Sequence, residues 1–274
     1  MDKNIGEAIK GGITGVMKGT REIAVGIVDV VSGTVVKALE GVKDVQGAVG
    51  SVVVGAISLV IKAAGAIGAD LTTATRNSIV GVIKGVHEVG TVTTDVIRDT
   101  VHEAVKATAE IGGDVGSVTK SAIVGAIRGT RDIAISSEDA AAEAARGAIR
   151  AVSEVGADAG LAAKNAVKGA IGGVADTSGR LITVIKDTSR GLVLETSRLG
   201  GDAASIATNA VVGAIEAAKE VGISAEETAS AAAMGAIEAA REVGGETGAA
   251  IRKAVTGTIA GIKVVVKEPF KREK

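Results

Sequence analysis

The 274-residue chain has no cysteine, no tryptophan and no tyrosine, and it contains a single phenylalanine and a single proline. Without cysteine it can form neither a disulfide framework nor a thiolate site. Without aromatic side chains it lacks the bulky residues of an ordinary globular core and the stacking platforms that bind nucleic-acid bases. Its formal net charge of −1 gives no attraction toward phosphate backbones. The first residues lack a signal-peptide pattern, so we expect a cytoplasmic location and no nucleic-acid partner.

Glycine is abundant instead, with 39 residues, and much of it recurs at a fixed interval. In the frame set by the tripeptide Gly-Ala-Ile, units begin at Gly11, Gly33, Gly55, Gly81, Glu103, Gly125, Gly147, Gly169, Gly191, Gly213, Gly235 and Gly257. Every interval is 22 residues except the one of 26 after Gly55, where four inserted residues can be placed at 77–80. The chain is therefore one repeat array. We number the positions of each unit as columns 1 to 22.

The spacing of apolar residues within the unit indicates helix and not strand. They concentrate in columns 2, 3, 6, 9, 13, 17, 20 and 21, three or four apart, and strict alternation is nowhere sustained. Such a unit makes six turns at about 3.67 residues per turn, the period of 11-residue repeats. We therefore predict an all-α chain in which residues 11–267 form one very long continuous amphipathic helix of 22-residue (2 × 11) repeats. A lead-in at 1–10 and a charged tail at 268–274 flank it, and an antiparallel helical bundle is the alternative.

On such a helix the apolar columns cover roughly half of the circumference. This arc is too broad for a two-stranded seam and predicts several partner helices or a lipid surface. Glycine costs about 1 kcal/mol relative to alanine inside a helix, so its repetition implies close backbone contacts that compensate. The helix contacts are expected at Gly125, Ala126, Ile127, Gly147, Ala148, Ile149, Gly169, Ala170, Ile171, Gly213 and Gly235.

Charged residues form two strips beside the apolar arc. Column 8 is mainly acidic, whereas columns 4, 18 and 22 are mainly basic. One interpretation is a solvated face with weak pairs inside one helix. The sharper hypothesis is that the acidic edge of one helix faces the basic edge of its neighbour, a heterologous contact that generates rings or open assemblies. The edge charges expected there are Glu110, Asp132, Glu154, Asp176, Arg128, Arg150, Lys164 and Lys168.

Residues 45–69 stand apart because the part from Val45 to Ile61 carries no charge. Their length is close to the roughly 20 residues that span a bilayer. Ser51 and Gly55 have the four-residue spacing of closely packed membrane helices. However, the repeat columns run through this segment, and no aromatic residue marks a membrane interface. We expect a more buried stretch of the same array, with a transmembrane span as the alternative.

The sequence has no recognisable catalytic, cofactor or metal motif. His87 and His102 would lie about 22 Å apart on a helix and could not share a metal. Neither Gly112-Gly113 nor Gly200-Gly201 is followed by the Gly-Lys-Ser/Thr of a phosphate-binding loop. We therefore expect no enzymatic activity, no cofactor and no metal.

The units that begin at Gly213 and Gly235 both read Gly-Ala-Ile-Glu-Ala-Ala, then Lys or Arg, then Glu-Val-Gly. This pattern resembles hendecad-repeat helical proteins. More loosely, it is similar to the 11-residue amphipathic repeats of synucleins, perilipins and late-embryogenesis-abundant proteins. The resemblance implies a long amphipathic helix and, as in the lipid-binding members, a lipid surface as partner.

Together these patterns predict a non-enzymatic structural protein that assembles with copies of itself. Gly/Ala/Val/Ile helix faces and complementary acidic and basic edges would join the helices into a filament, tube, sheet or bundle. The alternative is an amphipathic coat protein on a membrane or lipid surface, which would make the cytoplasmic protein membrane-associated.

Overall fold

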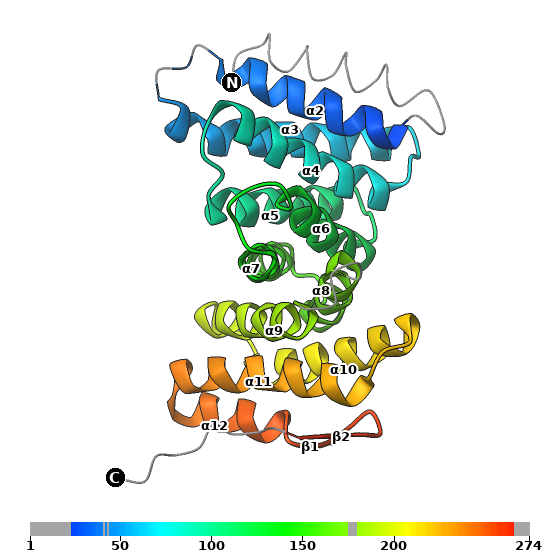
Figure 1. Cartoon of the computed structure of the whole chain (residues 1–274), viewed down its shortest axis with the longest axis vertical. Coiled ribbons are helices and arrows are strands. Elements are labelled where there is room, and N and C mark those ends of the chain that lie inside the picture. Colours follow the sequence, from blue (N-terminus) through cyan, green and yellow to red (C-terminus); the bar gives the residue numbers. More distant parts are fainter. Residues whose placement is uncertain (1–22, 41, 43, 175–179, 266–274) are drawn as a thin grey trace.

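The computed structural model of the chain is an elongated stack of short helices (Figure 1). It describes residues 23–40, 42, 44–174 and 180–265, so the lead-in at 1–10 and the tail at 268–274 lie outside the described residues. The helices of the described part are α2 (Ile23–Leu39), α3 (Val45–Ala66), α4 (Leu71–Val89), α5 (Thr94–Glu110), α6 (Val115–Gly129), α7 (Ser137–Val155), α8 (Ala159–Val174), α9 (Leu181–Arg198), α10 (Ala203–Val221), α11 (Ala225–Val243) and α12 (Gly245–Ala254). An antiparallel hairpin of β1 (Gly257–Ile259) and β2 (Ile262–Val264) follows.

The described part of the chain is all-α apart from this hairpin, but the prediction of one very long continuous helix is wrong. The repeat units form separate helices joined by turns, with about one helix for each unit of the repeat. Consecutive helices run roughly antiparallel and pack side by side (Figure 1). The folded-back arrangement that the sequence left as the alternative is therefore closer to the structure.

Two columns of the repeat end one helix and start the next. The helices α3, α5, α7 and α9 are each followed by a glycine with a left-handed backbone: Gly68, Gly112, Gly156 and Gly200, with φ of 67°, 70°, 67° and 74°. These glycines stand at column 10, Gly68 once the four inserted residues are placed before it, as shown below. Glycine adopts this conformation without the penalty that a Cβ atom brings. At column 12 an aspartate accepts a hydrogen bond from a backbone N–H in the first turn of the next helix: Asp70, Asp114, Asp158 and Asp202. A C-terminal glycine followed by an N-cap aspartate is a strong helix-turn-helix signal.

The helices form two layers. The even-numbered helices α2, α4, α6, α8 and α10 pack side by side in one layer, and the odd-numbered helices α3, α5, α7, α9 and α11 do so in the other. Each interior helix therefore contacts the helices two positions before and after it, as well as its chain neighbours in the opposite layer. At the C-terminal end, α12 packs on α10 and α11, and β2 packs on α11. The structure thus repeats every two sequence units.

The core lies between and within these layers and consists of small and β-branched side chains. Its largest members include Ile79, Ile123 and Ile171, each at most 1% exposed, and alanines fill the space around them. Most of the broad apolar arc of the described helices is thus covered by other helices of the same chain. The sequence correctly required several partners for this arc, but the chain supplies them itself.

The four inserted residues lie in α3 and not at 77–80. From Asp70 to Asp114 the N-cap aspartates are two regular units apart, whereas the interval from Asp44 to Asp70 is one regular unit with the four additional residues. The ion pair of Lys62 with Glu110 joins α3 to α5 at the same sequence separation at which Lys106 on α5 pairs with Glu154 on α7. The register is therefore regular from about Lys62 onward. The insertion adds a turn near the start of α3, which has 22 residues.

Candidate interaction surfaces

The column-1 glycines lie where helices of one layer touch. Gly125, Gly147, Gly169, Gly213 and Gly235 are buried, and a Cβ atom on any of them would come closer than 3.0 Å to a backbone carbonyl oxygen two helices earlier. Those carbonyls belong to Arg76, Arg98, Lys120, Lys164 and Lys186. The neighbouring residues Ala126, Ile127, Ala148, Ile149, Ala170 and Ile171 are at most 2% exposed. The structure thus places the expected helix-contact residues between helices of one chain.

The register of these contacts is constant. Each glycine meets the carbonyl of the residue numbered 49 lower, in the even layer as in the odd layer. Gly191 follows the same rule with Ala142, and Gly81 meets Val28 at that separation lengthened by four, because the insertion lies between them. One packing geometry therefore recurs through most of the stack. The close approach compensates for the roughly 1 kcal/mol that glycine costs inside a helix.

In the even layer, a basic edge meets an acidic edge between α8 and α10. Lys164 Nζ lies 2.8 Å from Glu216 Oε1, and Lys168 Nζ lies 2.8 Å from Glu216 Oε2 and 2.9 Å from Glu220 Oε1. The hydrogen bonds from Lys164 and then Lys168 lower the pKa of Glu216. Because these side chains are partly exposed to water, each pair contributes at most about 1 kcal/mol.

The odd layer contains similar pairs. Between α5 and α7, Glu154 Oε2 lies 3.0 Å from His102 Nε2 and 3.5 Å from Lys106 Nζ. Between α3 and α5, Glu110 Oε2 lies 2.9 Å from Lys62 Nζ, and the hydrogen bond from Lys62 lowers the pKa of Glu110. Between α9 and α11, Lys186 pairs with Glu238 and Arg190 with Glu242. In these interfaces the acidic and basic edges therefore face each other inside the molecule.

The remaining predicted edge charges behave differently. Arg150 on α7 binds Glu195 on α9 at 3.0 Å, and the Glu195 side chain is only 4% exposed. The predicted edge charges do not include Glu195, although an acid in column 5, where Gly129 and Gly173 stand in other units, is an anomaly that could have marked it. Arg128 and Asp132 are exposed at the end of α6 and in the following turn. Asp176 lies outside the residues that the structure describes.

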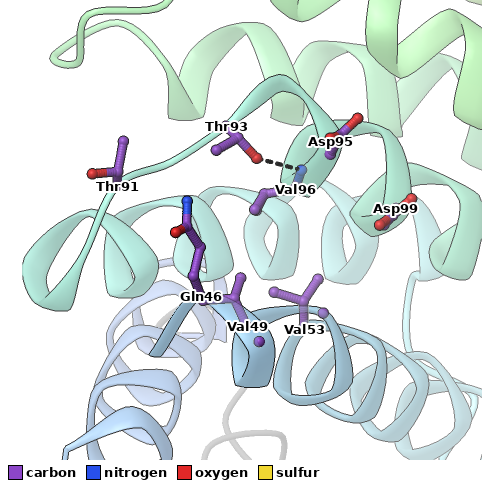
Figure 2. A pocket seen from close by; sticks show the side chains of 10 residues that line it. Gln46, Val49, Val53, Thr91, Thr93, Asp95, Val96 and Asp99 are labelled. Carbon is purple, nitrogen blue, oxygen red and sulfur yellow. Dashed lines mark hydrogen bonds between the residues drawn. The ribbon is translucent and has the colours of Figure 1, made fainter. Parts of the chain in front are cut away.

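A hollow of about 310 Å³ lies beside the extended start of α3. Figure 2 shows Gln46 and the valines of α3 on one side and the α4–α5 turn on the other. Thr93 accepts a hydrogen bond from the Val96 N–H at its edge and so caps α5. Asp95, on the same side, pairs with Arg98. Thr93 and Asp95 thus serve the start of α5, and the lining of the hollow contains neither histidine nor cysteine.

Metal ligands are not gathered anywhere in the described part of the chain, which has no group of three or more His, Cys, Asp or Glu residues able to hold an ion. Among the described helices, only α3 is long and apolar enough to cross a membrane. Several of its apolar side chains, including Val53, Ile57 and Val60, are fully buried against the rest of the stack. Such burial is the ordinary reason for apolar residues in a packed helix.

One edge of the stack carries a repeated pattern of exposed groups, and we call it the turn edge. It is formed by the ends of the odd-numbered helices, each with an apolar residue at column 9: Ile67, Ile111, Val155, Leu199 and Val243. Ile67 is 52% exposed and Leu199 is 43% exposed, while the other three are partly buried. The exposed N-cap aspartates Asp70, Asp114, Asp158 and Asp202 lie in the same turns. The turn edge therefore presents an apolar side chain and usually a carboxylate once per helix pair.

The sequence matches no protein-family model and no curated protein. The geometry of the stack is therefore the basis on which a function can be argued.

Proposed function

We propose that the protein is a non-enzymatic structural protein whose copies associate through the turn edge into a filament, tube, sheet or bundle. The glycine faces and many of the complementary charges are used inside each chain, so they are not free to join different chains. The turn edge recurs along the stack and keeps Ile67, Leu199 and the N-cap aspartates exposed. Its repetition is the observation that supports this proposal.

The spacing of the turn edge suits an interaction between identical chains. Packed helices lie about 8–10 Å apart, so its apolar residues recur at a regular distance set by the layer itself. Burial of apolar surface contributes roughly 25 cal/mol per Å². One exposed leucine or isoleucine is a weak contact, but several that engage together bind as a multivalent unit.

The opposite edge of the stack offers charges that complement the aspartates. Lys37, Arg128 and Lys219 are exposed in the last turns of α2, α6 and α10, at the ends that face away from the turn edge. This edge also carries acidic residues, of which Glu220 is paired with Lys168 inside the chain. Contact between the two different edges would be heterologous, which produces open assemblies unless the rotation closes a ring.

A pair of charge insertions tests this function. Ile67→Lys together with Leu199→Lys places two cations on the turn edge and should convert assembled protein into monomers. Val54→Lys is the matched control, because Val54 is 38% exposed but lies in the middle of α3, away from both edges. Light scattering coupled to size-exclusion chromatography and negative-stain images of the lipid-free protein give the readout.

The outcomes separate the alternatives. Regular particles that are lost in the double variant and kept in the Val54→Lys control support self-assembly through the turn edge. Wild-type protein that stays monomeric at every concentration tested contradicts it. Assembly that appears only on lipid vesicles would instead favour the coat protein.

A further inference from the structure

One side of α3 differs from the equivalent side of the other odd-numbered helices. In α7, this side faces α5 and is buried at Ala140, Gly147 and Ala151. The equivalent positions in α3, four repeat units earlier, are Val52, Leu59 and Ala63, and they are only partly buried. The helix that would cover them is the predecessor of α3 in the odd layer. Within the described part of the chain, α3 is the first helix of that layer.

The same side of α3 has also lost the charges that its counterpart uses. On α7, Glu143 Oε2 lies 3.2 Å from Arg98 Nη1 of α5. The residue of α3 equivalent to Glu143 is Gly55, and the residue equivalent to Glu154 is Ala66. A partner for α3 should therefore lack the cation that Arg98 supplies between α5 and α7. A candidate partner segment should therefore have an uncharged residue at the position equivalent to Arg98.

We propose that this side of α3 is the docking surface for the repeat unit contained in residues 1–22 of the same chain. These residues lie outside the described part, but they lead directly into α2, which packs on α3. In the alternation of the two layers, the unit that precedes α2 belongs with α3. Its apolar residues Ile5, Ile9 and Ile13 recur at the four-residue spacing of a helical face.

The register identifies which residues should meet. When the four inserted residues lie between two contacting helices, the column-1 residue of the later helix meets the backbone of the earlier helix. The sequence separation is then the one that joins Gly81 to Val28. In the register set by α7, the column-1 position of α3 is Leu59, and its partner at that separation is Gly6. On α7, α9 and α11 the column-1 residue is a glycine, as Gly147 is against Arg98, whereas on α5 it is Glu103. Here the large residue is on the later helix and the glycine on the earlier one.

Two changes at this interface therefore compensate each other. Gly6 stands where α5 has Arg98, and Gly55 stands where α7 has Glu143, so both members of that ion pair are absent together. The backbone carbonyl that Gly147 meets on Arg98 is also present in Gly6, so Leu59 requires a wider separation of the two helices, and the absence of an arginine side chain leaves room for the leucine beside that carbonyl. Exchanges that keep the combined volume are the ones that packed interfaces tolerate best.

A double-mutant cycle on the full chain tests this contact. Gly6→Leu should lower the thermal midpoint by several degrees, because two large residues would then meet. Leu59→Ala should restore part of the loss when it is combined with Gly6→Leu, which makes the two changes strongly non-additive. Gly6→Leu with Val54→Ala is the control, since Val54 lies on α3 outside the contact, and this pair should be additive. Additive effects for Gly6→Leu and Leu59→Ala would overturn the proposal.

Cross-linking of the same full chain tells which copy supplies the unit, and the absence of natural cysteine keeps the assay clean. Lys10→Cys and Ala66→Cys occupy the columns at which Arg190 and Glu242 pair between α9 and α11. A short bismaleimide should therefore link them within one monomer, as it should link Arg190→Cys to Glu242→Cys in the positive control. Covalent dimers would assign the surface to a second copy. A control pair that reacts while the test pair stays unlinked would leave α3 open to another occupant, such as lipid. Either result contradicts the proposal.

Discussion

The interface between α8 and α10 and the interface between α7 and α9 share one backbone register but not one chemistry. Gly213 meets the Lys164 carbonyl in the first and Gly191 meets the Ala142 carbonyl in the second, both at the same sequence separation. Beside this contact, the even-layer interface places its lysines and glutamates at the partly exposed border. The odd-layer interface instead buries Glu195 against α7.

In both interfaces the backbone contact sets the distance between the helices, whereas the charged side chains vary around it. The glycine contacts are the same in both interfaces, so backbone approach determines how near the helices lie. The charges change position without changing that register. We therefore expect the glycines to dominate stability, a buried pair to come second and the exposed pairs to contribute least.

The largest effect should come from alanine at a column-1 glycine. Gly169→Ala places a Cβ atom 2.5 Å from the Lys120 carbonyl oxygen, and such overpacking should lower the free energy of unfolding by about 1–3 kcal/mol. On the same helix, a Cβ atom on Gly172 would have its nearest neighbour at 3.9 Å. Gly172→Ala should therefore raise the free energy of unfolding by about 0.5–1 kcal/mol. Urea denaturation measures the change in the free energy of unfolding for both variants. A change of the same sign for Gly169→Ala and Gly172→Ala would show that glycine does not set the helix distance.

Removal of the buried carboxylate should have the next largest effect. Glu195→Ala leaves Arg150, whose side chain is 38% exposed, without its nearest partner and should lower the free energy of unfolding by about 2 kcal/mol. Glu216→Ala removes a border carboxylate and should cost at most about 1 kcal/mol. The double variant Glu195→Ala/Arg150→Ala should recover part of the loss, since it removes both members of the closest pair and leaves only the exposed Arg198 without Glu195. Equal losses for Glu195→Ala and Glu216→Ala in urea titrations would erase the distinction between the two interfaces.

The smallest effect concerns pH. Hydrogen bonds from lysines hold the pKa of Glu216 and Glu110 below the ordinary 4.5. Their contribution is therefore complete above pH 4.5 and is lost as the pH falls through the lower pKa of the folded state. Burial raises the pKa of Glu103 and Asp187, which acts in the opposite direction and offsets part of this loss. The urea midpoint should still fall between about pH 5 and pH 3.

A charge-neutral variant isolates this contribution. Glu216→Gln should make the fall in the urea midpoint shallower. Glu226→Gln, which alters an exposed carboxylate in the first turn of α11, is the control and should change the slope less. A midpoint that rises on acidification would mean that the buried carboxyls outweigh the border pairs.

Much of the helical character of this chain is predictable, because apolar residues three and four apart fix the helical period whatever the helices do afterwards. The separation into short helices is missed for a specific reason. Aspartates such as Asp114 also fit an acidic strip, and glycines such as Gly112 also fit a contact face. Their order, a glycine followed two residues later by an aspartate, is the stronger signal, because it ends one helix and caps the next.

Other features could not be derived from the sequence, because they depend on which helices become neighbours. The pairing of Lys164 with Glu216 joins two helices that are not consecutive in the chain, and it follows only from the two-layer arrangement. The hollow beside α3 likewise depends on how the start of α3 lies against the α4–α5 turn (Figure 2). Periodicity describes each helix surface, but it does not say whether the surface that covers it belongs to the same chain.

The constant glycine-to-carbonyl register has a consequence for how such a chain can change in length. The structure repeats only after two sequence units, so the gain or loss of one unit would move every later helix into the opposite layer. Because both layers use the same glycine-to-carbonyl contact, each displaced helix would still meet a neighbour of the right shape. The stack could therefore be extended or shortened by single helices, whereas an array with two unlike layers can only change by pairs.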